Sequence, residues 1–110
     1  MNLRIQKSPR FLADFEAQYG WYAAEAGAAV ARAYLDAVHL TIEIVAEHPG
    51  LGRRRRFRHP LLGGIQSFRV STPFQKHLVF YRQSDACLMV ERIVHGARDL
   101  PRRLLEPPGD

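Results

Sequence analysis

Alternating apolar and polar positions predict short β-strands near both ends of the chain. Residues 3–7 alternate in this way, as expected for a half-buried strand. Two apolar runs at 77–82 and 88–94 flank a polar turn at 83–85, which indicates a β-hairpin. A further extended segment at 65–72 precedes a proline turn, so four strands are expected.

Between the first strand and the others, apolar residues recur with helical spacing and predict two helices. Ser8 and Pro9 mark the start of the first, because Ser caps a helix well and Pro fits the first helical position. Gly27 is expected to end it, and a second helix runs from about 28 to 47 before Pro49 stops it. A connection this short makes the two helices an antiparallel hairpin. The expected buried stripes are Leu12, Phe15, Tyr19 and Tyr22 in the first helix and Val30, Tyr34, Val38, Ile42 and Val45 in the second.

The resulting order, β-α-α-β-β-β, predicts an α+β fold in which the helical hairpin packs on one face of a mainly antiparallel four-stranded sheet. A chain of 110 residues is the size of one domain. We expect that domain to cover residues 1–105, with one turn of helix near its end. Residues 106–110 are expected to form a flexible C-terminal tail.

Charge and composition narrow the class of partner. The chain has 16 Lys and Arg residues, 14 of them Arg, against 11 Asp and Glu, which gives a formal net charge of +5. This balance favours acidic partners: nucleic acid, an acidic protein segment or an anionic surface. No apolar run approaches the roughly 20 residues of a membrane span, and the single cysteine, Cys87, excludes an internal disulfide. The sequence thus favours a protein of the reducing cytoplasm without membrane contact.

The densest charge lies in a loop between the helices and the later strands. Residues 53–58 hold five guanidinium groups, those of Arg53, Arg54, Arg55, Arg56 and Arg58. Like charges packed this closely repel one another unless anions arrive, so contact with phosphates or carboxylates is one interpretation. A solvated loop that meets no partner is the other.

A second group of candidate residues follows the last strand. His95, Arg98 and Asp99 could cleave RNA by general acid–base chemistry, with the Arg stabilising the developing charge. His77 and Arg82 on the adjacent strand, or Arg69 on the one before, could join them. The alternative is a salt-bridged chain reversal, in which Asp99 caps the next segment or pairs with Arg98. No nucleophile or second base is evident in the sequence, which favours the structural interpretation.

Metal and cofactor sites are not expected. The five histidines show no i, i+4 pair and no cysteine partner at a zinc-binding spacing. Gly63 and Gly64 precede an expected strand rather than a helix, so they do not form a phosphate-binding loop.

Four segments follow one another in a recognisable order: Ser8-Pro9 with Asp14-Phe15, residues 47–52, Pro73-Phe74 leading into 77–82, and residues 92–100. Taken together, they resemble the ParE branch of the ParE/RelE toxin superfamily. The resemblance implies a compact α+β toxin of a type II toxin–antitoxin module. ParE-like members act on DNA gyrase, stabilise its cleaved-DNA complex and halt replication.

The resemblance also implies a partner, a ParD-like antitoxin whose C-terminal segment folds on the toxin. Tyr19, Tyr22 and Tyr34 are candidates for the groove that takes this segment, although each could equally be a core residue. The expected target-facing surface is the loop 53–58 together with Arg98, Asp99 and the C-terminal segment. No direct sequence-specific contact with nucleic acid is expected.

The alternative within the superfamily is the RelE branch, which cuts messenger RNA on the ribosome. Those nucleases use a cluster of basic residues and typically a C-terminal Tyr or His, which Arg69, Arg82 and His95 could partly imitate. The chain has no Tyr beyond Tyr81 and only two Lys residues. These departures from the RelE pattern favour a non-enzymatic toxin directed at gyrase.

Overall fold

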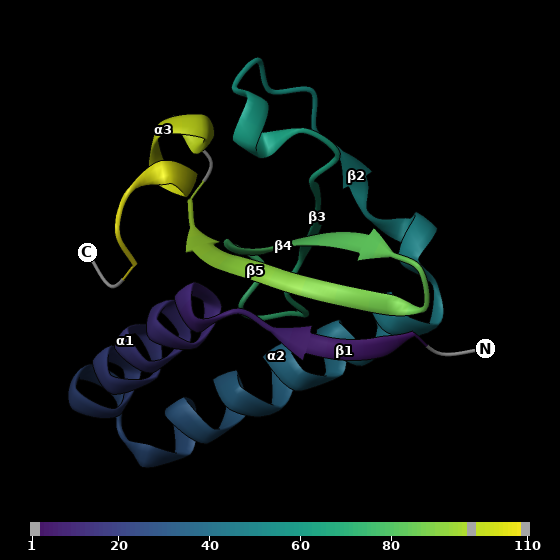
Figure 1. Ribbon diagram of the computed structural model, residues 1–110. Helices are drawn as coiled ribbons and strands as arrows, with labels where there is room; N and C mark the ends of the chain where they lie inside the picture. The colour runs from purple at the N-terminus through teal and green to yellow at the C-terminus, as the bar shows by residue number, and fades with distance from the viewer. Residues whose placement is uncertain (1–2, 97–98, 109–110) are drawn as a thin grey trace.

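A computed structural model describes residues 3–96 and 99–108 of the chain. Helices and strands follow the expected order, including a short C-terminal helix, with one additional strand (Figure 1). Two 3-10 turns, Pro49–Leu51 and Pro60–Leu62, lie in the segment that joins the helical hairpin to the later strands. The elements are β1 (Arg4–Lys7), α1 (Pro9–Ala26), α2 (Ala28–Glu47), β2 (Arg53–Arg54), β3 (Gln66–Arg69), β4 (His77–Ser84), β5 (Cys87–His95) and α3 (Leu100–Leu105).

The sheet has five strands in the order β1-β5-β4-β3-β2 and is mixed. The four-stranded prediction missed β2, which pairs antiparallel with β3. This strand is two exposed arginines at the sheet edge, so it has no apolar alternation to reveal it. The first strand also pairs parallel with β5, whereas the other neighbouring strands are antiparallel. The predicted α+β class and the helical hairpin are confirmed.

The helical hairpin begins and ends where the sequence predicts. The Ser8 hydroxyl accepts a hydrogen bond from the Phe11 backbone N–H at 3.0 Å, and Pro9 occupies the first helical position. Gly27 separates the helices at φ +95°, a backbone conformation that side chains with a Cβ rarely adopt. Among the described residues, no helix is both long enough and apolar enough to span a membrane.

The two helices cover one face of the sheet and form the larger core with it (Figure 1). The predicted stripe of α2 is largely correct, with Tyr34, Val38 and Ile42 at most 2% exposed. The stripe of α1 is shifted, because Leu12 is 46% exposed while Phe11 and Asp14 are buried. The helix therefore turns a carboxylate towards the sheet, which an apolar count along the sequence does not reveal.

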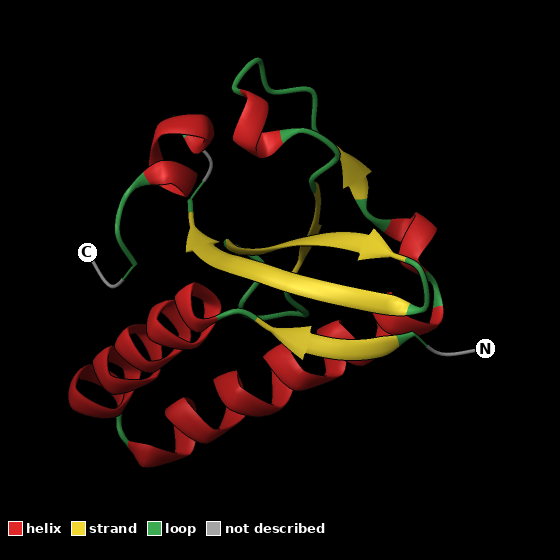
Figure 2. Ribbon diagram, viewed as in Figure 1, coloured by secondary structure: helices red, strands yellow, loops and turns green. Residues whose placement is uncertain are grey.

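The other face of the sheet carries a second, smaller core. Figure 2 shows the loop before β3 and the helix α3 on the side away from the hairpin. Their side chains pack on the sheet residues Leu78, Phe80 and Val94. The contributing side chains are Leu62 and Ile65 from the loop and Leu100 and Leu104 from α3. The C-terminal helix thus closes the second face rather than trailing from the domain.

Candidate functional site

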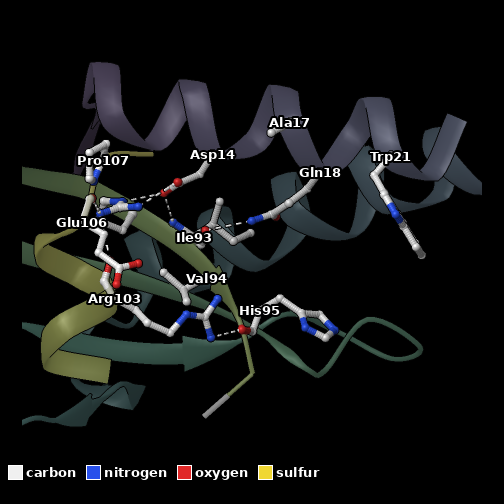
Figure 3. Close-up of a pocket in the computed structure, with 11 residues that line it drawn as sticks. Asp14, Ala17, Gln18, Trp21, Ile93, Val94, His95, Arg103, Glu106 and Pro107 are labelled. Carbon is white, nitrogen blue, oxygen red and sulfur yellow. Dashed lines mark hydrogen bonds and ion pairs between the residues drawn. The ribbon is translucent and has the colours of Figure 1, made fainter. Parts of the chain in front are cut away.

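A hollow of about 280 Å³ lies where α1, the end of β5 and the C-terminal segment meet (Figure 3). Helix α1 contributes Asp14, Gln18 and Trp21, one turn apart along the side that faces the sheet. The opposite wall comes from Arg103 and Glu106. Elements far apart in the sequence therefore build one concave surface.

A buried ion pair between Arg92 and Asp14 forms part of this hollow. Arg92 donates from Nε to Asp14 Oδ2 at 2.6 Å and from Nη2 to Oδ1 at 2.9 Å. The remaining guanidinium nitrogen donates to the carbonyls of Leu104 at 2.8 Å and Glu106 at 2.9 Å. The backbone N–H of Ile93 donates to Asp14 as well. The pair is therefore saturated by partners within the chain, and it ties the C-terminal segment to α1 and β5.

Next to the ion pair, Gln18 joins the two helices to β5. Its side-chain nitrogen donates to the Ile93 carbonyl at 2.9 Å, and its oxygen accepts from the Tyr34 hydroxyl. Burial, reinforced by the neighbouring Tyr22 and Asp14, raises the pKa of the Tyr34 hydroxyl far above its usual range. Tyr34 is thus a neutral donor, and Gln18 is oriented by bonds at both ends.

A pair of histidines lies where β4 begins and β5 ends. His77 and His95 are directly opposite on β4 and β5, with ring centroids 4.8 Å apart. The Nε2 of His77 is hydrogen-bonded to the Tyr22 hydroxyl at 2.9 Å, while its buried Nδ1 has no partner among the described residues. Burial, together with the charge of His95, lowers the pKa of His77 to about 4, so this ring is neutral at pH 7.

The histidines line a mostly apolar hollow of about 220 Å³ with Gln18, Trp21 and Tyr22. Trp21 is 60% exposed and offers a large apolar surface beside this hollow. Sequence analysis missed Trp21 because it lies off the predicted stripe of α1. Its position as the single Trp of the chain, next to that stripe, was the available signal.

The three residues considered for a nuclease are not brought together. His95 points to the helix side of the sheet, since it lies opposite His77. Arg69 lies opposite Leu78, and neighbouring strand residues face opposite sides, so Arg69 points to the far side. Arg82 lies on β4, four residues beyond Leu78. Its guanidinium donates to Glu91 and to the carbonyls of Leu61 and Gly63.

The arginine loop is partly built into the sheet. Arg53 and Arg54 form β2, and Arg55 donates from Nε to the Ser67 hydroxyl at 2.8 Å. Arg56 and Arg58 are exposed. The loop is therefore not simply a solvated connection, because its first half is held in place by β3.

The remaining predicted residues have varied surroundings. Arg98 lies outside the described residues. Asp99 precedes α3 at φ +53°, makes no side-chain capping bond, and forms an exposed ion pair with Arg102 at 3.7 Å. Tyr34 is completely buried, whereas Tyr19 and Tyr22 are half-buried. Only the last two therefore offer surface to a partner. In the described part of the chain, no group of three or more His, Cys, Asp or Glu residues has the arrangement of a metal site.

Comparisons with known proteins agree with this architecture. Residues 5–100 match the family model described as the ParE toxin of the type II toxin–antitoxin system parDE. A solved structure of the chromosomal ParDE system from P. aeruginosa has the same fold, with a TM-score of 0.70 and 15% sequence identity. The similarity covers 86% of this chain and 97% of that chain. No curated protein matches the sequence. Since the family model spans nearly the whole domain, the chain belongs to the ParE toxin family of type II toxin–antitoxin systems.

Proposed function

We propose that the chain poisons DNA gyrase and that an acidic, ParD-like antitoxin neutralises it. The observation that supports gyrase rather than messenger RNA as the target is the separation of His95 from Arg69 on opposite faces of the sheet. A general acid–base group and a cation that stabilises charge must reach the same phosphate. In this arrangement a sheet lies between them.

The surroundings of Arg82, the third residue considered for a nuclease, also argue against RNA cleavage. Arg82 forms a half-buried ion pair with Glu91 and donates to two backbone carbonyls. A guanidinium with this set of partners is a structural group, because binding a phosphate requires it to release them. The function of the chain therefore rests on its surfaces rather than on a bond-breaking centre.

The antitoxin is proposed to bind the apolar hollow beside α1. Trp21, Tyr22 and His95 line it, and it suits an apolar side chain of a segment that folds on binding. The formal charge of +5 on the toxin steers an acidic segment towards it. Tyr19 is half-buried on the same helix and extends this surface.

The gyrase-facing surface is proposed to be the arginine loop 53–58 with Asp99 and the neighbouring C-terminal segment. Loop and segment lie on the same side of the sheet, away from the hairpin (Figure 1). The apolar hollow proposed for the antitoxin contains no residue of the loop or of the C-terminal segment, so the two partners use different residues.

The deciding experiment combines two readouts on the purified chain. With gyrase, ATP and supercoiled plasmid, we expect cleaved DNA to accumulate, while ribosome-bound transcripts stay intact. His95→Ala should retain the gyrase effect, as should the matched control His39→Ala at an exposed site on α2. Transcript cleavage that depends on His95, with no effect on gyrase, would establish the RelE-like alternative instead.

A further inference from the structure

The arginine run lines two neighbouring hollows, and Arg55 belongs to both. Arg54, Arg55 and Arg56 line the first hollow, which also contains the carboxylate residue Asp85. Arg53 and Arg55 line a second hollow of about 520 Å³ together with Arg69 and Lys76. We call this second hollow, defined by those four residues, the basic cleft. No Asp or Glu is among the described residues that line it.

The four cations of the basic cleft have no acidic partner within the described part of the protein. Five ion pairs within 4 Å exist among the described residues, and none includes these four side chains. The charges act on one another: burial, followed by the charges of Arg53 and Arg69, lowers the pKa of Arg55. Repulsion of this kind is relieved when an anion enters, so the cleft is suited to a polyanionic ligand.

One cation is fixed in position. Arg55 is anchored by its bond to Ser67 at 2.8 Å, and its guanidinium carbon lies 5.9 Å from the centre of the Phe80 ring. Arg69 and Lys76, in contrast, are exposed and free to adjust to a ligand. A preorganised guanidinium beside adjustable charges is a common arrangement for binding phosphate oxygens.

The lining of the cleft distinguishes between kinds of polyanion. Leu78 is 7% exposed and Leu100 is 5% exposed, so the cleft has no apolar anchor for a folding peptide among its described residues. Phe80 is completely buried under Arg55, so its ring is not available to stack unpaired bases. The cleft therefore offers positive charge alone, which suits the phosphate backbone of a nucleic acid.

We propose that the basic cleft binds the phosphate backbone of duplex DNA without reading its sequence. The proposal rests on the proposed gyrase function in one respect: duplex DNA is chosen as the polyanion because it is the substrate that gyrase holds. The toxin then contacts the DNA of the gyrase complex as well as the enzyme. Binding of this kind is consistent with the expectation that the chain makes no sequence-specific contact with nucleic acid.

The test is fluorescence anisotropy of the full chain with a labelled duplex of about 20 base pairs at several salt concentrations, without gyrase. The double variant Arg69→Ala/Lys76→Ala should bind at least about tenfold more weakly, and its salt slope should fall by about 2. The matched control Arg4→Ala/Arg32→Ala also removes two positive charges, one from β1 at the opposite edge of the sheet and one from α2. It should change the affinity for DNA less than about twofold.

The charge-conserving variant Arg69→Lys/Lys76→Arg should restore binding, and thermal unfolding of every variant should match the unsubstituted chain, since the substituted side chains are exposed. Equal losses in both double-alanine variants would reduce the effect to net charge and overturn the proposal. Binding of polyglutamate but not DNA would assign the cleft to an acidic protein, and preference for single-stranded RNA would assign it to a different nucleic acid. Cleft-dependent DNA binding by a chain that leaves gyrase unaffected would separate this proposal from the proposed function.

Discussion

Asp14 of α1 and Arg92 of β5 form a two-pronged ion pair in which both side chains are less than a tenth exposed. Around this pair the first helix, the last strand and the C-terminal segment meet. Removing one partner leaves the other charge buried and uncompensated, which typically costs about 3–5 kcal/mol. We expect Asp14→Ala to lower the free energy of unfolding by this amount in a urea titration.

The control for this prediction is Arg32→Ala, which breaks the exposed pair with Asp36 on α2 and should cost less than about 1 kcal/mol. The double variant Asp14→Leu/Arg92→Met should recover much of the loss, because it removes both charges. An Asp14→Ala variant as stable as the control would show that the pair does not hold the C-terminal segment.

The second prediction concerns pH. The pKa of His77 is about 4 in the folded protein, against 6.5 for an unperturbed histidine, so the unfolded chain binds the proton more readily. Stability is therefore nearly independent of this group above pH 6.5 and declines as the pH falls from 6.5 towards 4. Between pH 7 and pH 5 the loss should be about 2 kcal/mol.

Substituting His77 with Gln should remove this part of the pH dependence, measured as urea midpoints at pH 7 and pH 5. His39→Gln, at an exposed site, should leave the dependence in place. If His77→Gln loses as much stability as the unsubstituted chain on acidification, another group is responsible.

The third prediction uses two glycines of one turn. A Cβ at Gly52 would lie 1.9 Å from the Tyr81 hydroxyl and 2.6 Å from its ring, whereas a Cβ at Gly50 would meet nothing within 4 Å. Tyr81 is completely buried and donates to the Pro49 carbonyl at 2.7 Å, so it cannot move away. Gly52→Ala should lower stability by about 1–3 kcal/mol, and Gly50→Ala should change it little.

Thermal unfolding of the two variants measures the difference. Adding Tyr81→Phe to Gly52→Ala should recover part of the loss, because it removes the atom that comes closest. Equal melting temperatures for Gly50→Ala and Gly52→Ala would contradict the tight contact.

The fourth prediction addresses the antitoxin. Trp21 is 60% exposed beside the apolar hollow, and Leu40 on α2 is 51% exposed away from it. Trp21→Ala should weaken antitoxin binding in calorimetry at least about tenfold, since exposed aromatic anchors dominate interface energies. Leu40→Ala should leave the affinity unchanged, and both variants should keep the fold. A loss confined to Leu40→Ala would move the antitoxin site to the other side of the hairpin.

Most of the fold could be predicted because its elements carry local signals. Ser8 acts through its own capping hydroxyl, Pro9 and Gly27 act through their backbone preferences, and the stripe of α2 recurs strongly enough to place its buried face. The strand β2 could not be found this way, since two exposed arginines have no apolar pattern and become a strand only through pairing with β3.

The candidate site was less accessible from sequence. Arg92 stands in an apolar strand, and a buried charge requires a partner, so an acidic partner for it could have been sought, although Asp14 lies off the predicted stripe of α1. The placement of His95 and Arg69 on opposite faces could not, because it depends on strand register.

By itself the sequence determined the helical hairpin, the hairpin of β4 and β5, the α+β class and the family, since caps, turns and periodicity are properties of neighbouring residues. Only the tertiary structure decided which charges meet. It paired Asp14 with Arg92 across 78 positions, gathered Arg53, Arg55, Arg69 and Lys76 in one cleft, and separated the residues of the nuclease alternative. Long-range electrostatic contacts depend on how the layers pack, and packing is a property of the whole chain.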